Sequence, residues 1–192
     1  MTALKIVPIE ERSESYRKVL RYFFSYPQLA ISLNDLSRKI KVGKTSTKAA
    51  VTHLINEKFL EKEVIGNAWR IYIANQKDQF MITRKIPYNL ELIYESGIIA
   101  KVYHKIPQAR AILLFGSYRW GTDNENSDID LAVEILGKHD LRIETLEILE
   151  NLGFRKKVKV NLHIFSRSKI DLNLFTNIAN GIVLDGLLEV HP

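Results

Sequence analysis

The 192-residue sequence contains no cysteine, and this absence excludes several kinds of chemistry. A chain without thiols forms no disulfide bond, has no cysteine nucleophile and binds no metal through thiolates. Any metal must therefore be bound by oxygen or imidazole ligands. This restriction favours a hard cation such as Mg²⁺.

Glycine and proline are also scarce, at 9 and 5 residues, and the sequence has no long apolar run. This composition argues against a fibrous or disordered chain, and 46% hydrophobic residues are enough to build a core in one large or two small domains. The apolar stretch over residues 4–9 is interrupted by Lys5 and Pro8, so it is neither a secretory signal nor a membrane span. We therefore predict a cytoplasmic globular protein with no membrane partner.

The formal net charge of +6 is unevenly distributed along the chain. Residues 1–85 carry 16 Lys or Arg against 8 Asp or Glu, whereas residues 86–192 carry 12 against 14. A basic half followed by a mildly acidic half is typical of a nucleic-acid-binding module joined to a carboxylate-bearing enzyme domain. A solvated surface that is basic for no functional reason is the alternative.

Hydrophobic spacing predicts three helices and then a β-hairpin in the first half. A serine cap precedes the second helix, and Gly43 permits a sharp turn before the third. One helix is predicted over residues 14–25, a second begins at the cap formed by Ser32 and Asp35, and a third covers residues 45–59. Two strands are predicted over residues 60–65 and 69–73, on either side of a turn at Gly66 and Asn67. This order indicates a winged helix-turn-helix over residues 1–75.

The third predicted helix presents a polar face away from its apolar stripe. In a helix-turn-helix this face enters the major groove of DNA, and its lysines pair with phosphates. The candidate DNA-binding residues are Lys44, Lys48, Thr52, His53 and Asn56 on the helix and Arg70 on the hairpin, where a minor groove is within reach. Trp69 is expected to be a core residue. A solvated helix in a protein-binding winged domain is the alternative.

Residues 76–87 are predicted to form a linker, because polar residues gather at its start and Pro87 closes it. Residues 88–192 are predicted to be a minimal α/β domain with a small mixed sheet, which makes the chain α+β overall. The elements expected in this domain are helix 89–105, strand 111–115, strand 128–134, helix 141–152, strand 157–165 and helix 170–179.

Two short motifs in this second half predict a site for a metal-bound nucleotide. A strand that ends in Gly116 and Ser117 lets the backbone approach a phosphate, and the serine adds a hydroxyl. Asp128 and Asp130 are two residues apart on a predicted strand, so both carboxylates leave the same face and can converge on one cation. Mg²⁺ or Mn²⁺ bound there would bridge the oxygens of a nucleoside triphosphate.

Gly-Ser followed after ten residues by Asp-x-Asp resembles the polymerase-beta-type nucleotidyltransferase superfamily, especially its minimal stand-alone members and the related antitoxins that transfer AMP to a toxin. The resemblance covers residues 88–188, and residues 181–186 are similar to the closing segment of the minimal members. It implies metal-dependent transfer of a nucleoside monophosphate to a hydroxyl, which a protein such as a toxin can supply. The sites it implies are Asp128, Asp130 and Asn161 for catalysis, the two aspartates for the metal, and Gly116, Ser117 and Arg119 for the nucleotide.

Two positions differ from the family pattern. Many stand-alone members carry Arg at the position of Trp120, and here Arg119 lies one place earlier. The family has a third carboxylate where this chain has Asn161; that carboxylate binds a second metal or accepts the proton of the attacking hydroxyl, and an amide does neither well. His163 shares the strand face of Asn161 and is a candidate substitute base, with a structural histidine as the alternative. Glu134 is expected to lie too far along its strand to replace the carboxylate.

Two functions therefore remain open. The first is a nucleotidyltransferase whose winged helix binds it to DNA. The second is a DNA-binding regulator or antitoxin-like protein whose weakened transferase domain senses a nucleotide or binds a partner. Asn161 favours the second, whereas the intact Gly-Ser and Asp-x-Asp motifs favour the first, which we prefer. The acceptor, the base of the nucleotide and the oligomeric state, a homodimer among the options, are not specified by the sequence.

Overall fold

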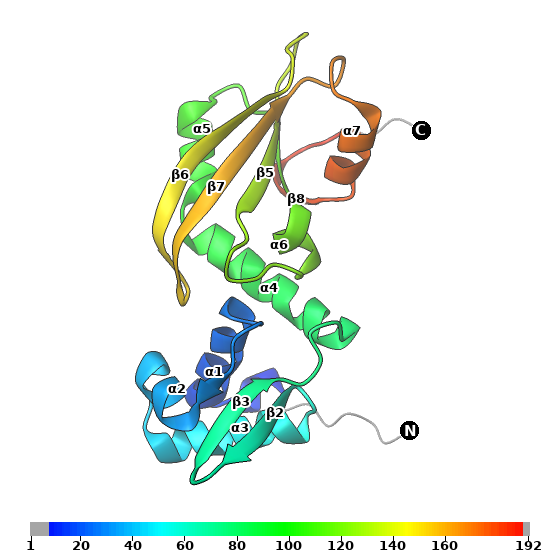
Figure 1. The fold of residues 1–192 in the computed structure, drawn as a ribbon. Coiled ribbons are helices and arrows are strands. Elements are labelled where there is room, and N and C mark those ends of the chain that lie inside the picture. Colours follow the sequence, from blue (N-terminus) through cyan, green and yellow to red (C-terminus); the bar gives the residue numbers. More distant parts are fainter. Residues whose placement is uncertain (1–7, 190–192) are drawn as a thin grey trace. The chain divides into compact units, whose positions relative to one another are not determined.

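The computed structural model describes residues 8–189, the side chains of residues 9, 80 and 81 excepted. It divides between Met81 and Ile82 into two compact units, called unit 1 and unit 2 below (Figure 1). The apolar stretch noted over residues 4–9 lies almost wholly outside the described residues. Within the described part of the chain, no helix has the length and apolar character that crossing a membrane requires.

Unit 1 combines helices with a small antiparallel sheet in which β3 is the central strand. In chain order its elements are η1 (Ile9–Glu11), α1 (Glu14–Ser25), β1 (Ile31–Ser32), α2 (Leu33–Ile40), α3 (Lys44–Asn56), β2 (Leu60–Ile65) and β3 (Ala68–Ile73). The predicted helices and hairpin are all present. The predicted cap is confirmed, since the Ser32 hydroxyl oxygen accepts from the Asp35 backbone N–H at 3.1 Å. The two-residue strand β1, paired with β3, was not predicted.

Unit 2 is built on a mixed five-stranded sheet in the order β6-β7-β5-β4-β8. Its elements are α4 (Gln79–Glu95), α5 (Ile98–Lys105), β4 (Ala111–Phe115), α6 (Gly116–Trp120), β5 (Ile129–Glu134), β6 (Arg142–Leu152), β7 (Arg155–Phe165), α7 (Leu172–Ala179) and β8 (Ile182–Gly186). Strands β5 and β7 are parallel, and the other neighbours are antiparallel. The expected small mixed sheet is therefore present.

Helices cover the two faces of this sheet unequally, as Figure 1 shows. Ile93 of α4 and Ile98 and Val102 of α5 are fully buried against one face, to which the central strands contribute only apolar side chains. On the other face α7 covers a smaller cluster around Ala132 and Phe165. The rest of that second face is not covered by an apolar cluster, and this is where polar side chains can gather.

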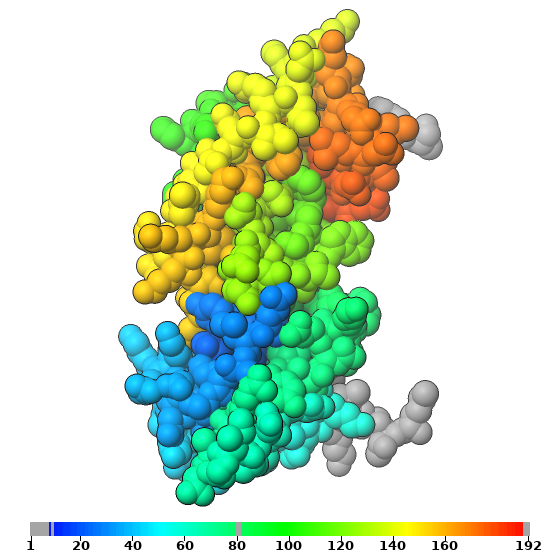
Figure 2. Space-filling model, in the orientation of Figure 1, coloured from blue at the N-terminus to red at the C-terminus, as the bar shows by residue number. Residues whose placement is uncertain are grey.

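The prediction of a helix over residues 141–152 is wrong, because this segment forms strand β6. Leu146 and Leu149 are three residues apart, which imitates the period of a helix. In the structure a register shift between Thr145 and Glu147 breaks the alternation of the strand and lets both leucines pack against the same core. Figure 2 shows the yellow atoms of this edge strand along one side of unit 2. Pairing with β7 along the whole strand overrides the local helical preference.

The linker predicted over residues 76–87 contains the boundary between the two units, and its second part, residues 79–87, is helical and belongs to α4. Pro87 lies inside this helix, where it removes one backbone hydrogen bond without ending the helix. Tertiary packing outweighs that loss, because Lys85, Tyr88 and Asn89 of the same helix are all buried. The single helix predicted over residues 89–105 is divided at Gly97, whose φ is +73°.

Gly121 provides a test of this packing, because both its conformation and its surroundings require glycine. Its φ is +70°, and an added Cβ atom would lie 2.5 Å from the carbonyl oxygen of Ile82. At Gly97 the φ is +73° but nothing lies within 4 Å of an added Cβ. We expect Gly97→Ala to lower the free energy of unfolding by about 1 kcal/mol through backbone strain alone, and Gly121→Ala to lower it by about 3 kcal/mol. Urea unfolding of both variants checks this, and equal losses would contradict the described contact.

Candidate functional site

The polar site of unit 2 lies on the sheet face opposite α4 and α5. Asp130 is on β5 and Asn161 is its direct partner on β7, because these strands are parallel and in register at this point. Asp128 lies one residue before β5. The Asn161 amide nitrogen is 3.3 Å from a carboxylate oxygen of Asp128 and 3.3 Å from one of Asp130. The structure therefore brings the three residues predicted for catalysis together.

Asn161 lies between the two carboxylates and donates to both of them. Two carboxylates this close repel each other when both are ionised, and the donated N–H groups offset part of that repulsion. An amide carries no charge, so it offsets the repulsion between the carboxylates less completely than a cation would. Rotation of the amide by 180° would present its oxygen instead, and the same three side chains would then offer oxygen ligands to a cation.

His163 lies beside the carboxylates on the same strand face. Its Nε2 atom is 3.5 Å from a carboxylate oxygen of Asp130, and its ring packs edge-on against Phe115 with the ring centroids 4.8 Å apart. Its side chain is 15% exposed, and its Nδ1 atom is buried with no hydrogen-bond partner among the described residues. The residue predicted as a substitute base is thus placed at the edge of the site with Nε2 towards it.

Gly116 brings the first motif against the second. It follows β4 directly and has a φ of +69°, a conformation that side chains other than glycine rarely adopt. An added Cβ atom would lie 3.0 Å from the Asp130 Oδ2 atom, so the backbone passes very close to this carboxylate. Ser117 follows in the short helix α6, and its carbonyl oxygen accepts from the backbone N–H of Thr122. The two predicted halves of the nucleotide site are therefore adjacent.

Arg119 and Trp120 lie one turn further along α6. The guanidinium carbon of Arg119 is 3.6 Å from the centroid of the Trp120 ring, and its Nε atom donates to the carbonyl oxygen of Asn180 at 2.8 Å. These two contacts fix the position of Arg119 in the absence of nucleotide. Trp120 is about half exposed. Its ring therefore adds an aromatic surface beside Arg119.

Glu134 is a structural residue, as its distance along β5 predicted. Its carboxylate is buried and accepts from two nitrogen atoms of Arg167, at 3.0 Å and 2.8 Å. The Glu134 carboxylate is thus engaged by Arg167 rather than by the site.

The donor set of the site fits a magnesium ion that is shared with a substrate. Among the described residues, no group of three or more His, Cys, Asp and Glu side chains could enclose a metal on its own. Mg²⁺ typically takes one or two protein carboxylates and completes its shell with phosphate oxygens and water. Asp128 and Asp130 supply that number of carboxylates beside the backbone turn at Gly116.

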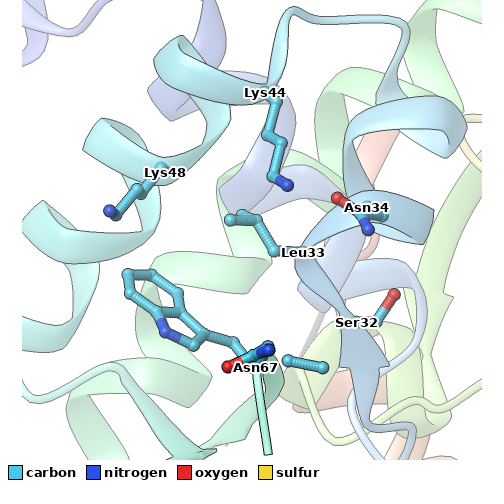
Figure 3. Close-up of a pocket in the computed structure, with 8 residues that line it drawn as sticks. Ser32, Leu33, Asn34, Lys44, Lys48 and Asn67 are labelled. Carbon is cyan, nitrogen blue, oxygen red and sulfur yellow. The ribbon is translucent and has the colours of Figure 1, made fainter.

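Unit 1 carries a second polar site, a pocket of about 210 Å³. Its lining residues are Ser32, Leu33, Asn34, Lys44, Lys48, Asn67, Ala68 and Trp69. Figure 3 shows Lys44 and Lys48 extending from α3 on one side, with Asn34 on α2 opposite. Two cations beside polar side chains make this pocket suitable for an anion.

Trp69 corrects the expectation of a core tryptophan, because it is only partly buried and forms a wall of this pocket. The ammonium groups of Lys62 and Lys48 lie 3.7 Å and 5.3 Å from the centroid of its ring. Lysines in this arrangement gain a cation–π attraction while remaining near water. The turn end of the β2–β3 hairpin is therefore aromatic and basic at once.

The other predicted DNA-binding residues also lie on the surface of unit 1. Thr52, His53 and Asn56 line a shallow hollow of about 400 Å³ on α3 together with Lys48. Arg70 on β3 is exposed, and it pairs with Glu63 of β2 at 3.2 Å. The predicted face of α3 is thus continuous, whereas Arg70 is partly neutralised by its neighbour.

A buried cluster beneath the loop between α6 and β5 was not predicted at all. It contains Lys85 and Asn89 of α4, Asp123 of the loop and Arg155 of β7. Lys85 lies in the segment predicted to be a linker, and no sequence motif marks any of these residues. The one signal in the sequence was that Asp123 lies only a few residues before the Asp-x-Asp motif.

Comparison with known proteins matches residues 98–185 to the family described as Polymerase beta, Nucleotidyltransferase. A relative, the protein adenylyltransferase MntA of Shewanella oneidensis, is 46% identical over 44 residues, which are 23% of this chain. The matched segment spans about a third, 32%, of that protein's length. The family match includes β4, β5 and β7, and with them the site residues Ser117, Asp128, Asp130, Asn161 and His163. Residues 98–185 of unit 2 are therefore similar to nucleotidyltransferase domains of the polymerase beta type.

Proposed function

We propose that this protein transfers a nucleoside monophosphate, with AMP as the first candidate, from a nucleoside triphosphate to a hydroxyl group of a protein. The observation that carries the proposal is the convergence of Asp128, Asp130 and Asn161 beside the close backbone turn at Gly116. The name of the relative, a protein adenylyltransferase, supports AMP and a protein acceptor. A toxin is one acceptor of this class.

In the proposed reaction each residue of the site has a separate task. The attacking hydroxyl oxygen forms a bond to the α-phosphorus, the bond to the pyrophosphate group breaks, and pyrophosphate leaves with its electron pair. The backbone at Gly116 and the Ser117 hydroxyl bind the phosphates, and Asn161 orients the two carboxylates through its N–H groups. Asp128 and Asp130 would hold Mg²⁺, which would supply stabilisation of the charge that develops on the leaving group.

The proton of the attacking hydroxyl requires an acceptor, because Asn161 replaces the carboxylate that would otherwise serve. We assign this task to His163. Its Nε2 atom lies 3.5 Å from a carboxylate oxygen of Asp130, and an imidazole nitrogen is a common proton acceptor in catalysis.

We also propose that unit 1 is a winged helix module that binds DNA. The order of its helices and hairpin supports this, as do Lys44 and Lys48 on the exposed side of α3 and the basic pocket next to the hairpin. Phosphates would be bound by these lysines while α3 enters the major groove. The second candidate function, a nucleotide-sensing DNA-binding regulator, is favoured by one observation, the amide at position 161.

Removal of both carboxylates tests the metal site. In Asp128→Ala with Asp130→Ala we expect Mg²⁺-dependent binding of a non-hydrolysable ATP analogue to be lost. The free energy of unfolding should stay the same or rise, because two carboxylates that repel each other have been removed. Calorimetry is the measurement, and Asp140→Ala, an exposed acid of the same unit, is the control. Equal binding by the double variant and the natural protein would place the metal elsewhere.

Variants at His163 and Asn161 identify the proton acceptor. With labelled triphosphate in single-turnover transfer, and extract supplying the acceptor, we expect His163→Ala and His163→Gln to lower transfer about a hundredfold. Asn161→Asp should change it by less than tenfold, because the base is already present. His104→Ala, an exposed histidine of α5, is the control.

Two other outcomes of this experiment have distinct meanings. A gain of about a hundredfold in Asn161→Asp, with no loss in either His163 variant, would show that the missing carboxylate limits the enzyme and that His163 is not the base. If none of the proteins transfers label while all of them bind nucleotide, the enzyme proposal fails and the sensor function stands.

DNA binding is tested by its dependence on salt. We expect the full chain to bind duplex DNA with an affinity that falls by about 0.9 log unit per log unit of salt for each phosphate neutralised. Lys44→Ala and Lys48→Ala should each reduce this slope by about one phosphate. Lys18→Ala, which removes an α1 lysine paired with Glu14, should leave the slope unchanged. Fluorescence anisotropy at several salt concentrations measures it, and salt-independent or absent binding would refute the proposal.

A further inference from the structure

The loop between α6 and β5, residues 121–128, rests on charged side chains that are almost completely removed from water. The side chains of Lys85 and Asp123 are 1% and 3% exposed, and Arg155 is buried as well. Charged groups are rarely buried to this extent, because desolvation is costly even when the charges are paired. Burial indeed lowers the pKa of Lys85, and the charge of Asp123 offsets this only in part.

These cations bind the backbone of the loop at regular intervals. The ammonium group of Lys85 contacts both the carboxylate of Asp123, at 2.9 Å, and its carbonyl oxygen. Arg155 donates from one nitrogen to the carbonyl oxygens of Glu125, at 3.1 Å, and Ser127, at 2.5 Å. The carbonyls of every second residue from 123 to 127 are therefore held from the protein interior.

Further hydrogen bonds complete the support. Asn89 of α4 donates to the Asp123 carboxylate at 2.7 Å and to the carbonyl oxygen of Tyr118 at 3.0 Å. Arg155 also donates to the Tyr118 hydroxyl. Residues of α4, α6, the loop and β7 are thus tied together at one place.

This support matters because the two metal-binding aspartates are held differently. Asp130 lies within β5, where neighbouring strands on both sides fix its backbone. Asp128 precedes the strand and follows Ser127 directly, so its position depends on the loop. The loop also makes hydrogen bonds of its own, from the Ser127 N–H to the Asn124 carbonyl oxygen and from the Asn124 N–H to the Ser127 hydroxyl, and the buried cations bind it from the interior.

We propose that Lys85 and Arg155 are positioning residues that hold the loop so that the Asp128 carboxylate meets the same cation as Asp130. This inference rests on the proposed function, because it presumes that the aspartates bind a metal. Groups that orient a metal ligand from behind typically contribute a factor of ten to a hundred in metal affinity. A buried ion pair adds little stability compared with apolar residues of similar volume, so its benefit must lie elsewhere.

The test replaces Lys85 and Asp123 together, so that neither of them is left as a buried charge without the other. In the full-length chain, Lys85→Met together with Asp123→Leu removes both charges and keeps most of the volume. The matched control is Lys101→Met with Glu147→Leu, which removes an exposed pair, 2.6 Å apart, between α5 and β6. Mn²⁺ binding is measured by electron paramagnetic resonance, and hydrogen exchange of residues 121–128 by mass spectrometry.

We expect the buried double variant to bind Mn²⁺ ten to a hundred times more weakly and to exchange faster in the loop, while its urea midpoint stays near that of the control. Arg155→Lys keeps the charge but loses the contact with two carbonyl oxygens, so it should weaken Mn²⁺ binding as well. Unchanged affinity or unchanged loop exchange in a folded double variant would overturn the inference and leave the proposed function intact. If the natural protein itself binds no Mn²⁺, the proposed function fails instead.

Discussion

The candidate site depends on one strand pairing, the parallel alignment of β5 with β7. Asp130 and Asn161 are 31 residues apart in the sequence, and only this register places them side by side. A shift of one residue would turn the amide to the helix-covered face and bring an apolar side chain to the carboxylates. The apolar residues that alternate with the site on both strands prevent such a shift, because they are buried under α4 and α5. Core and site therefore specify each other.

The same alternation explains how much of the site was predictable. A spacing of two placed Asp128 with Asp130, and Asn161 with His163, on common faces without knowledge of the sheet. The glycine at position 116 was predicted to let the backbone approach a phosphate, which stays a prediction; the structure places it against the Asp130 carboxylate. These features are local, and local periodicity is what a single sequence records best.

Features that depend on distant partners were not predictable in the same way. Residues 141–152 look helical because leucines recur at a spacing of three, and only the pairing with β7 makes them a strand. Lys85 was assigned to a linker, since a proline two residues later usually marks a boundary. Its role appears only when α4 and the loop around Asp123 are seen together. Trp69 was likewise assigned to the core, whereas it is only partly buried and lies beside Lys48 and Lys62.

The central claim is that Asp128 and Asp130 share one divalent cation with the phosphates of a nucleotide at Gly116. The most direct measurement is anomalous X-ray diffraction from a crystal grown with Mn²⁺ and a non-hydrolysable ATP analogue. The account predicts an anomalous peak bonded to oxygen atoms of both carboxylates and of the triphosphate, with Asn161 in contact with a carboxylate. A peak bonded to neither aspartate, or a triphosphate bound away from Gly116, would contradict it.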